Sequence, residues 1–370
     1  MTESSVVEPG QDLQVREVPR DGMREFFLTC AGTTAASLGP TAVRLEEGFG
    51  GTVVAAQCLG PAASEFSRSA ADTLLTGTTV PLTWVLGESS AHWLGGIHLH
   101  AVADAEVRPL VLDGKVVGTL IGGRYAEECM LGGIHAQDTT VAAAVQARTT
   151  YERMEQALAL AGMDFSHVAR TWLYLDDILY WYGDFNRVRT AFYTERGVFD
   201  GLVPASTGIG ASNPHGAAMV AGAYAVRAIH PEVTAQAVVS PLQCPALEYG
   251  SSFSRAVEVA MPDLRRLFIS GSASIAPDGK TQHVGNVAAQ TARTCEVIAA
   301  ILESRGMGWD DVTRATAYVR FREDARVFEQ YCAAVGMPSL PVIVAHNVIC
   351  RGDLLFELEV DAVEARSFRP

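Results

Sequence analysis

Two carboxylates, Glu357 and Glu359, stand two residues apart in the apolar segment Leu354–Val360. Side chains alternate along a β-strand, so both carboxylates and Leu355 would share one face, with the other apolar side chains opposite. Two neighbouring, partly buried carboxylates repel each other, which raises the pKa of one and provides a proton donor near neutral pH. A solvated strand face or structural ion pairs are the alternative interpretation.

Arginines are the candidates for binding an anion: Arg170, Arg255, Arg320, Arg322 and Arg351. The chain has a formal net charge of -14, so any attraction for an anion must be local, and a guanidinium can hold a carboxylate through two hydrogen bonds. Arg255 and Arg320 are the first choices. Tyr249 would offer its hydroxyl to the ligand or pack against its ring. Surface arginines and a half-buried tyrosine are the alternatives.

Three other motifs carry weaker signals. Backbone N–H groups at Thr207 and Gly208, in the run TGIG, could bind an anion, although this run is also typical of a turn between strands. His98 and His100 share a strand face at a spacing compatible with a metal, but without a third nearby ligand two hydrogen-bonded or exposed histidines are expected. The glycine-rich run 48–52 lacks the context of a nucleotide loop. The sequence therefore predicts neither a metal nor a nucleotide cofactor.

The composition indicates a globular protein, with 48% hydrophobic residues among 370. The sequence pI near 5.1 argues against nucleic acid as a partner, because phosphate binding requires clustered lysine and arginine. No apolar stretch approaches the roughly 18 residues of a membrane span, and residues 1–19 do not resemble a secretory signal. The seven cysteines form no CxxC pair, which favours reduced, mostly buried thiols. We therefore expect a cytoplasmic protein with no membrane partner.

The elements that must position these residues recur three times along the chain. Short β-type runs begin at Val80-Pro81, Val203-Pro204 and Leu340-Pro341, each followed by an apolar strand. The proline and the final valine of that strand are 21, 22 and 22 residues apart, which favours an internal repeat. The predicted boundaries are 1–19 for a polar lead-in, 20–106 for a degenerate unit, and 107–231 and 232–370 for two complete units.

Each unit is expected to run β, α, β, α, β, β, with two helices covering one face of its sheet. First strands are predicted around 26–30, 118–123 and 266–271, long helices at 138–161 and 284–305, and shorter helices at 184–196 and 324–335. Asp138 is the expected N-cap of the first long helix, and Gly162 and Gly306 would end the two long helices. The first unit is predicted to lack its long helix and one strand.

This unit, with a late x-P-x-x-x strand and a closing L-x-E-x-E strand, resembles the YjgF/Rid family, whose members form trimeric barrels with sites between subunits. The resemblance implies an α/β (α+β) fold in which tandem YjgF/Rid-like, or chorismate-mutase-like, units form an intramolecular pseudo-trimeric barrel. The imine deaminases of that family carry an arginine two residues after the proline, where this chain has Thr83, Ser206 and Ile343. The difference argues against imine deamination.

A closer resemblance, over about residues 164–364, is to the chorismatases, which remove pyruvate from chorismate without a cofactor. It depends on the order and spacing of several segments: ARTW (169–172), PASTGIGA (204–211), YG…FSRA (249–256), RLFISGSASI (266–275), VRFRED (319–324) and ICRGDLLFELE (349–359). Glu357 stands where chorismatases carry the acid that protonates the enolpyruvyl methylene. Cys350 and Gly271 match the 3-hydroxybenzoate-forming branch, whereas the diol-forming branch has alanine at both positions.

The resemblance implies an enzyme that converts chorismate to 3-hydroxybenzoate and pyruvate, with arginines holding the two carboxylates of this small dianionic substrate. A barrel completed within one chain is expected to be a monomer or a weak homo-oligomer. Two alternatives remain open. One is a chorismatase-like enzyme acting on another enol ether or an amino analogue, or hydrolysing chorismate to the diol; the other is a non-catalytic Rid-type protein that binds a small metabolite.

Overall fold

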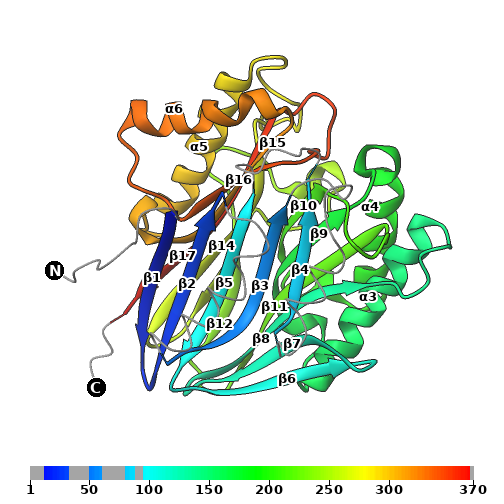
Figure 1. Ribbon diagram of the computed structural model, residues 1–370, viewed down its shortest axis with the longest axis vertical. Helices are drawn as coiled ribbons and strands as arrows, with labels where there is room; N and C mark the ends of the chain where they lie inside the picture. The colour runs from blue at the N-terminus through cyan, green and yellow to red at the C-terminus, as the bar shows by residue number, and fades with distance from the viewer. Residues whose placement is uncertain (1–11, 33–49, 61–79, 88–94, 367–370) are drawn as a thin grey trace.

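The computed structural model describes residues 12–32, 50–60, 80–87 and 95–366, and its described strands form three sheets (Figure 1). The first sheet has five strands in the order β1-β2-β5-β3-β4. Their bounds are β1 Asp12–Arg20, β2 Met23–Ala31, β3 Thr52–Gly60, β4 Leu82–Leu86 and β5 Gly96–Ala103. Neighbours pair antiparallel except β3 and β4, which are parallel.

The second sheet has six strands in the order β10-β9-β11-β8-β7-β6. Its elements are β6 Glu106–Leu112, β7 Lys115–Gly122, β8 Ala126–His135, α3 Ala143–Leu160, β9 Val168–Leu175, α4 Ile178–Glu195, β10 Ala205–Gly210 and β11 Met219–Ala228. Helices α3 and α4 bury one apolar face each against the sheet, through Tyr151, Met154 and Phe192 among others. The parallel pair β9 and β10 is joined by α4, the usual solution for parallel neighbours.

The third sheet repeats this plan in the order β12-β13-β14-β17-β15-β16. Its elements are β12 Thr234–Val238, β13 Ala256–Ala260, β14 Leu264–Ala273, α5 Val287–Ser304, β15 Val312–Val319, α6 Ala325–Val335, β16 Val342–His346 and β17 Phe356–Ala365. Gly162 and Gly306, both with positive φ, end α3 and α5 in the same way. In each case the amide of the third residue after the helix closes the turn, with Met163 donating to the carbonyl of Leu158 and Met307 to that of Leu302.

The structure corrects several details of the sequence prediction. The predicted lead-in contains β1 from Asp12 on, and each complete unit has two further strands before its long helix. Asp138 does not cap α3; its carboxylate accepts from Thr140 instead, and α3 begins at Ala143. Helix α4 begins at Ile178, earlier than predicted. The first sheet has five strands against six in the others, while the predicted absence of a long helix concerns a stretch outside the described residues.

The three sheets turn their other faces toward one shared interior. A single cluster of buried side chains draws on all three, including Phe27 of β2, Tyr174 of β9 and Tyr318 of β15. Figure 1 shows α3 and α4 on one side of the molecule and α5 and α6 on another, with the strands between them. One chain thus forms a pseudo-threefold barrel, as predicted.

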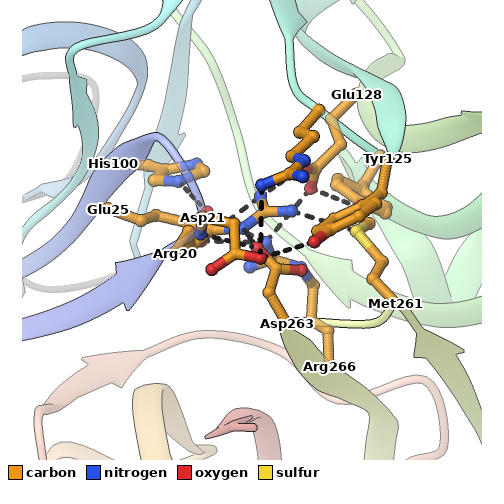
Figure 2. Close-up of polar contacts among 11 residues, drawn as sticks. Arg20, Asp21, Glu25, His100, Tyr125, Glu128, Met261, Asp263 and Arg266 are labelled. Atoms are coloured by element: carbon orange, nitrogen blue, oxygen red, sulfur yellow. Dashed lines mark hydrogen bonds and ion pairs between the residues drawn. The ribbon is translucent and has the colours of Figure 1, made fainter. Parts of the chain in front are cut away.

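A buried ionic cluster joins residues of all three sheets (Figure 2). Arg266 of β14 lies 2.9 Å from Glu25 of β2 and 3.1 Å from Glu128 of β8. Arg20 of β1 contacts both of these carboxylates, and His100 of β5 lies 2.6 Å from Glu25. Removal of one partner from such a cluster would leave an uncompensated buried charge, which strongly destabilises the fold.

Candidate active site

A pocket lies where the second and third sheets meet, between α4, β10, β14 and β17. Seven of the ten site residues predicted from the sequence line it: Gly208, Tyr249, Arg255, Gly271, Cys350, Arg351 and Glu357. They come from segments up to about 150 residues apart, since Gly208 is on β10 and Glu357 on β17. The fold therefore brings most of the predicted site into one cavity.

Glu357 is the acidic side chain of this pocket and is only 4% exposed. It pairs with Ala273 of β14 and Tyr318 of β15, so the strand register fixes its backbone on both sides. Burial, reinforced by repulsion from Glu359, raises the pKa of Glu357 to about 8, against the smaller opposing effects of Arg170 and Arg255. At neutral pH the carboxyl is therefore mostly protonated and can donate a proton.

Glu359 lies on the same strand face but has a different role. Two guanidinium groups hold it, with Arg170 Nη2 and Arg314 Nη2 each 2.8 Å from a carboxylate oxygen. Burial raises its pKa, but the two arginines outweigh that effect and keep the pKa below its ordinary value. The pair thus divides into one neutral acid and one permanent carboxylate, because only Glu359 has cationic partners in contact.

Arg170 and Thr207 do not line the pocket, contrary to the sequence prediction. Both are completely buried, and Arg170 Nη2 donates to Thr207 Oγ1 at 2.6 Å as well as to Glu359. The Thr207 hydroxyl also accepts from the backbone N–H of Gly271 at 3.0 Å. Arg170 and Thr207 therefore hold Glu359 and the Gly271 backbone in place, and neither side chain is open to a ligand.

Gly271 must be a glycine for this arrangement of Glu357. A Cβ built on Gly271 would lie 2.0 Å from Glu357 Oε1 and 3.2 Å from Thr207 Cγ2. No such contact is sterically possible, so a larger residue here would displace the carboxyl. Gly271 therefore determines where the proton donor sits.

Cys350 lines the same pocket at the turn that precedes β17. Burial and the nearby Glu357 raise the pKa of the Cys350 thiol to about 12. The thiol is therefore uncharged at neutral pH, and it contributes volume and a weak polar contact with Tyr182 rather than a nucleophilic thiolate.

Arg255 is the clearest candidate for an anion anchor. Its Nε donates to the carbonyl of Cys244 at 3.0 Å, while Nη2 is buried and has no hydrogen-bond partner among the described residues. The guanidinium stacks on Tyr249 and Phe253, with centroid distances of 5.3 and 5.7 Å. A buried, stacked guanidinium with a free N–H suits a ligand carboxylate.

Arg351 also lines the pocket, but Arg320 does not. Arg351 Nη1 donates to the carbonyl of Gly279 at 2.7 Å, which holds the side chain over Tyr249. Arg320 stacks instead on its neighbour Phe321. The predicted first-choice anchor Arg320 is therefore not among the residues that line this pocket.

Sequence reasoning missed several residues of the pocket: Tyr182, Arg189, Ser206, Ser251, Phe253, Ala273, Ile275 and Leu354. Arg189 is the most informative, since it is 2% exposed and its Nε has no partner among the described residues. It lies on the buried face of α4 that also carries Phe185 and Phe192. An arginine at a core position of an amphipathic helix was the available signal.

Two of the three weaker motifs lie within the described residues, while the run 48–52 lies partly outside them. Thr207 and Gly208 belong to strand β10, so neither the anion loop nor the turn is present there. His98 contacts the hydroxyls of Thr29 and Thr316, and His100 contacts Glu25, as expected for hydrogen-bonded histidines. Within the described ranges no group of histidine, cysteine and acidic residues is arranged to hold a metal ion. None of the helices described there is long and apolar enough to cross a membrane.

Parts of this chain are similar in sequence to known proteins. A family model described as endoribonuclease L-PSP matches residues 246–364. A chorismatase from Streptomyces rapamycinicus is 34% identical over 219 residues, covering 53% of this chain and 64% of that protein. A chorismatase from Streptomyces hygroscopicus is 32% identical over 212 residues, covering 52% and 60%. The chain thus spans less than two thirds of the length of either relative.

The fold itself matches over a longer stretch. A crystal structure of a chorismatase superimposes with a TM-score of 0.64 over 84% of this chain and 92% of that one, at 23% sequence identity. One segment thus matches the L-PSP family model, about half of the sequence matches the two curated relatives, and most of the fold matches a solved structure. The chain is therefore similar in sequence to chorismatases over about half of its length, and it shares the fold of a solved chorismatase.

Proposed function

We propose that this protein converts chorismate to 3-hydroxybenzoate and pyruvate without a cofactor. The observation that carries the proposal is the neutral, buried carboxyl of Glu357 in a pocket that also holds Arg255 and Arg189, two buried guanidinium groups with unused donors. Chorismate has an acid-labile enol ether and two carboxylates, so it needs one proton donor and two cationic anchors. The related chorismatases support the same substrate.

In the proposed reaction, Glu357 transfers its proton to the terminal methylene carbon of the enolpyruvyl group. The positive charge that develops at the ether carbon is shared with the ether oxygen, which weakens the bond to the ring. The neighbouring ring hydroxyl oxygen then displaces pyruvate at the adjacent carbon and returns its proton to the Glu357 carboxylate. The ring product isomerises to the phenol, so the two products together contain the atoms of chorismate and no others.

The 3-hydroxybenzoate product is proposed from Gly271 and Cys350, which flank Glu357 in the cavity. The diol would require a water molecule at the reacting ring carbon, whereas the intramolecular route requires its exclusion. A neutral thiol and the close approach of Glu357 to the Gly271 backbone both limit the room for that water. Product choice would thus depend on the shape of the pocket rather than on a further catalytic group.

The decisive experiment is incubation of purified protein with chorismate. We expect pyruvate in a coupled assay and an equal amount of 3-hydroxybenzoate by chromatography. Parallel incubations with isochorismate and aminodeoxychorismate identify a different enol ether substrate if turnover of either exceeds that of chorismate. Folded protein that binds chorismate but releases no pyruvate would instead make this a binding protein and overturn the proposal.

The pH profile gives a second test. The acid form of Glu357 is required, and its pKa is raised to about 8. Log kcat/KM for pyruvate release should therefore be level between about pH 6 and 7 and fall with a slope near one above pH 8. A profile that rises through pH 8 would assign Glu357 the role of a base.

Anchoring of the substrate carboxylates is tested by Arg255→Ala. The loss of a charged, buried hydrogen bond should lower kcat/KM by about tenfold to a hundredfold, mainly through KM. Arg320→Ala is the matched control, because Arg320 lies outside the pocket, and its KM should stay within about twofold of the parent. Equal effects of the two substitutions would show that the pocket does not hold the substrate in this way.

A further inference from the structure

The arginines of the candidate active-site pocket are held by uncharged oxygens. Arg189, Arg255 and Arg351 line the pocket, and Glu357 is the one acidic side chain among the described residues that line it. The acceptors that hold the three guanidinium groups are, in the same order, the side-chain amide of Asn186 at 2.7 Å, the carbonyl of Cys244 at 3.0 Å and the carbonyl of Gly279 at 2.7 Å. Since the carboxyl of Glu357 is mostly protonated at neutral pH, the pocket carries an excess of positive charge.

Other buried arginines of the barrel contact carboxylates instead. Arg170 lies 2.8 Å from Glu359, and Arg266 lies 2.9 Å from Glu25. A buried cation without an anion destabilises a folded protein, because it has lost its hydration and gained no ion pair in return. The pocket arginines therefore lower the stability of the free protein, and a ligand with negative charges can restore it.

Arg189 shows how an uncharged acceptor fixes a pocket arginine. It is 2% exposed, and its Nη2 donates to Asn186 Oδ1 three residues earlier on α4. Its guanidinium lies 5.0 Å from the ring centroid of Phe185 and 5.8 Å from that of Phe253. Arg255 lies 5.7 Å from the same Phe253 ring. One aromatic ring thus contacts two cations, and each of them keeps a buried N–H without a hydrogen-bond partner among the described residues.

The amide at position 186 decides whether Arg189 keeps its charge for a ligand. An amide oxygen accepts from the guanidinium but carries no net charge, so it orients Arg189 without neutralising it. Aspartate has the same size and would accept the same hydrogen bond, but it would form an ion pair of the kind that Arg170 and Arg266 form. An ion-paired Arg189 would attract a ligand carboxylate much less.

We propose that Asn186 is a positioning residue of the active site, which orients Arg189 and leaves its charge uncompensated, so that the pocket selects a dianion. The inference rests on the proposed function, since it states how this pocket would bind the two carboxylates of its substrate. Asn186 is half-buried and does not line the pocket itself, so it acts through Arg189.

Two substitutions separate this role from a structural one. Asn186→Asp keeps the hydrogen bond and adds a negative charge, so KM for chorismate should rise about tenfold to a hundredfold at nearly parental kcat. Asn186→Leu removes the hydrogen bond but leaves Arg189 its charge, so KM should rise only about threefold while the melting temperature falls. A purely structural Asn186 requires the opposite order, because aspartate preserves the contact and leucine does not. A KM for Asn186→Asp at or below that for Asn186→Leu would contradict the proposal.

Binding of isophthalate, a ring with two carboxylates, tests the inference without turnover. We expect calorimetry to show that Asn186→Asp weakens isophthalate binding by about tenfold or more. Isophthalate should also raise the melting temperature of the parent more than that of Asn186→Asp. Asn286→Asp is the matched control, because it adds the same charge at the exposed N-cap of α5, outside the pocket, and should bind isophthalate as the parent does.

The two measurements distinguish failure of this inference from failure of the proposed function. Pyruvate release with a parental KM in Asn186→Asp overturns the role of Asn186 alone. A parent that binds isophthalate but releases no pyruvate overturns the proposed function, and the isophthalate titration of Asn186→Asp then decides the role of Asn186. A parent that neither turns over chorismate nor binds isophthalate overturns both.

Discussion

Glu357→Gln is expected to lower the rate of pyruvate release by about a thousandfold, because the amide cannot supply the proton that starts the reaction. The substitution preserves size and burial, so chorismate should still bind with a KM within a few-fold of the parent. The measurement is kcat and KM at pH 7 in the coupled pyruvate assay. Glu364→Gln is the matched control: it lies on the same strand, half-exposed and paired with Arg265, and should leave kcat unchanged.

The stability of Glu357→Gln shows whether its lost activity comes from chemistry or from misfolding. Folding raises the pKa of Glu357 from 4.5 to about 8, so the folded state binds this proton more tightly than the unfolded chain. The contribution of this carboxyl to stability is then complete below pH 4.5 and is lost as pH rises toward 8. The glutamine variant lacks that loss and should melt at a higher temperature than the parent at pH 9, with a smaller difference at pH 5. If the Glu357→Gln variant keeps a tenth or more of the parental kcat, Glu357 is not the acid that protonates the substrate.

Gly271→Ala is expected to reduce kcat by about a hundredfold, since displacement of a catalytic group by about 1 Å can have an effect of this size. The added methyl would lie 2.0 Å from Glu357 Oε1, so the carboxyl must move. KM should change little because Arg255 and Arg189 are untouched. The remaining product should contain a larger fraction of diol, and Gly271→Ala combined with Cys350→Ala should increase that fraction further.

Gly208→Ala is the control for this prediction. Gly208 lines the same pocket, but nothing lies within 4 Å of a Cβ built on it, so kcat and product ratio should remain near those of the parent. Chromatography of the aromatic acid and the diol, alongside the pyruvate assay, measures both quantities. If Gly271→Ala keeps the parental kcat, the position of Glu357 is not what limits the reaction.

Local pattern was sufficient to predict the repeated unit. The recurrence of proline, a short strand and a closing apolar strand indicated three sheets, and glycines 162 and 306 marked the helix ends correctly. These features depend on backbone conformation and on periodic burial, and short stretches of sequence determine both. The alternation along β17 likewise placed Glu357 and Glu359 on one face.

Tertiary structure decided which of these side chains form a site. Arg170 and Arg320 look alike in the sequence, yet the first is buried against Glu359 and the second lies outside the pocket. Arg189 was missed because its place in the pocket depends on how α4 packs against the sheet. Tertiary contacts also decide why the pKa of Glu357 is raised and that of Glu359 is lowered. Two arginines reach Glu359 across strands, so Glu359 is the carboxylate that stays charged and Glu357 the one that keeps its proton.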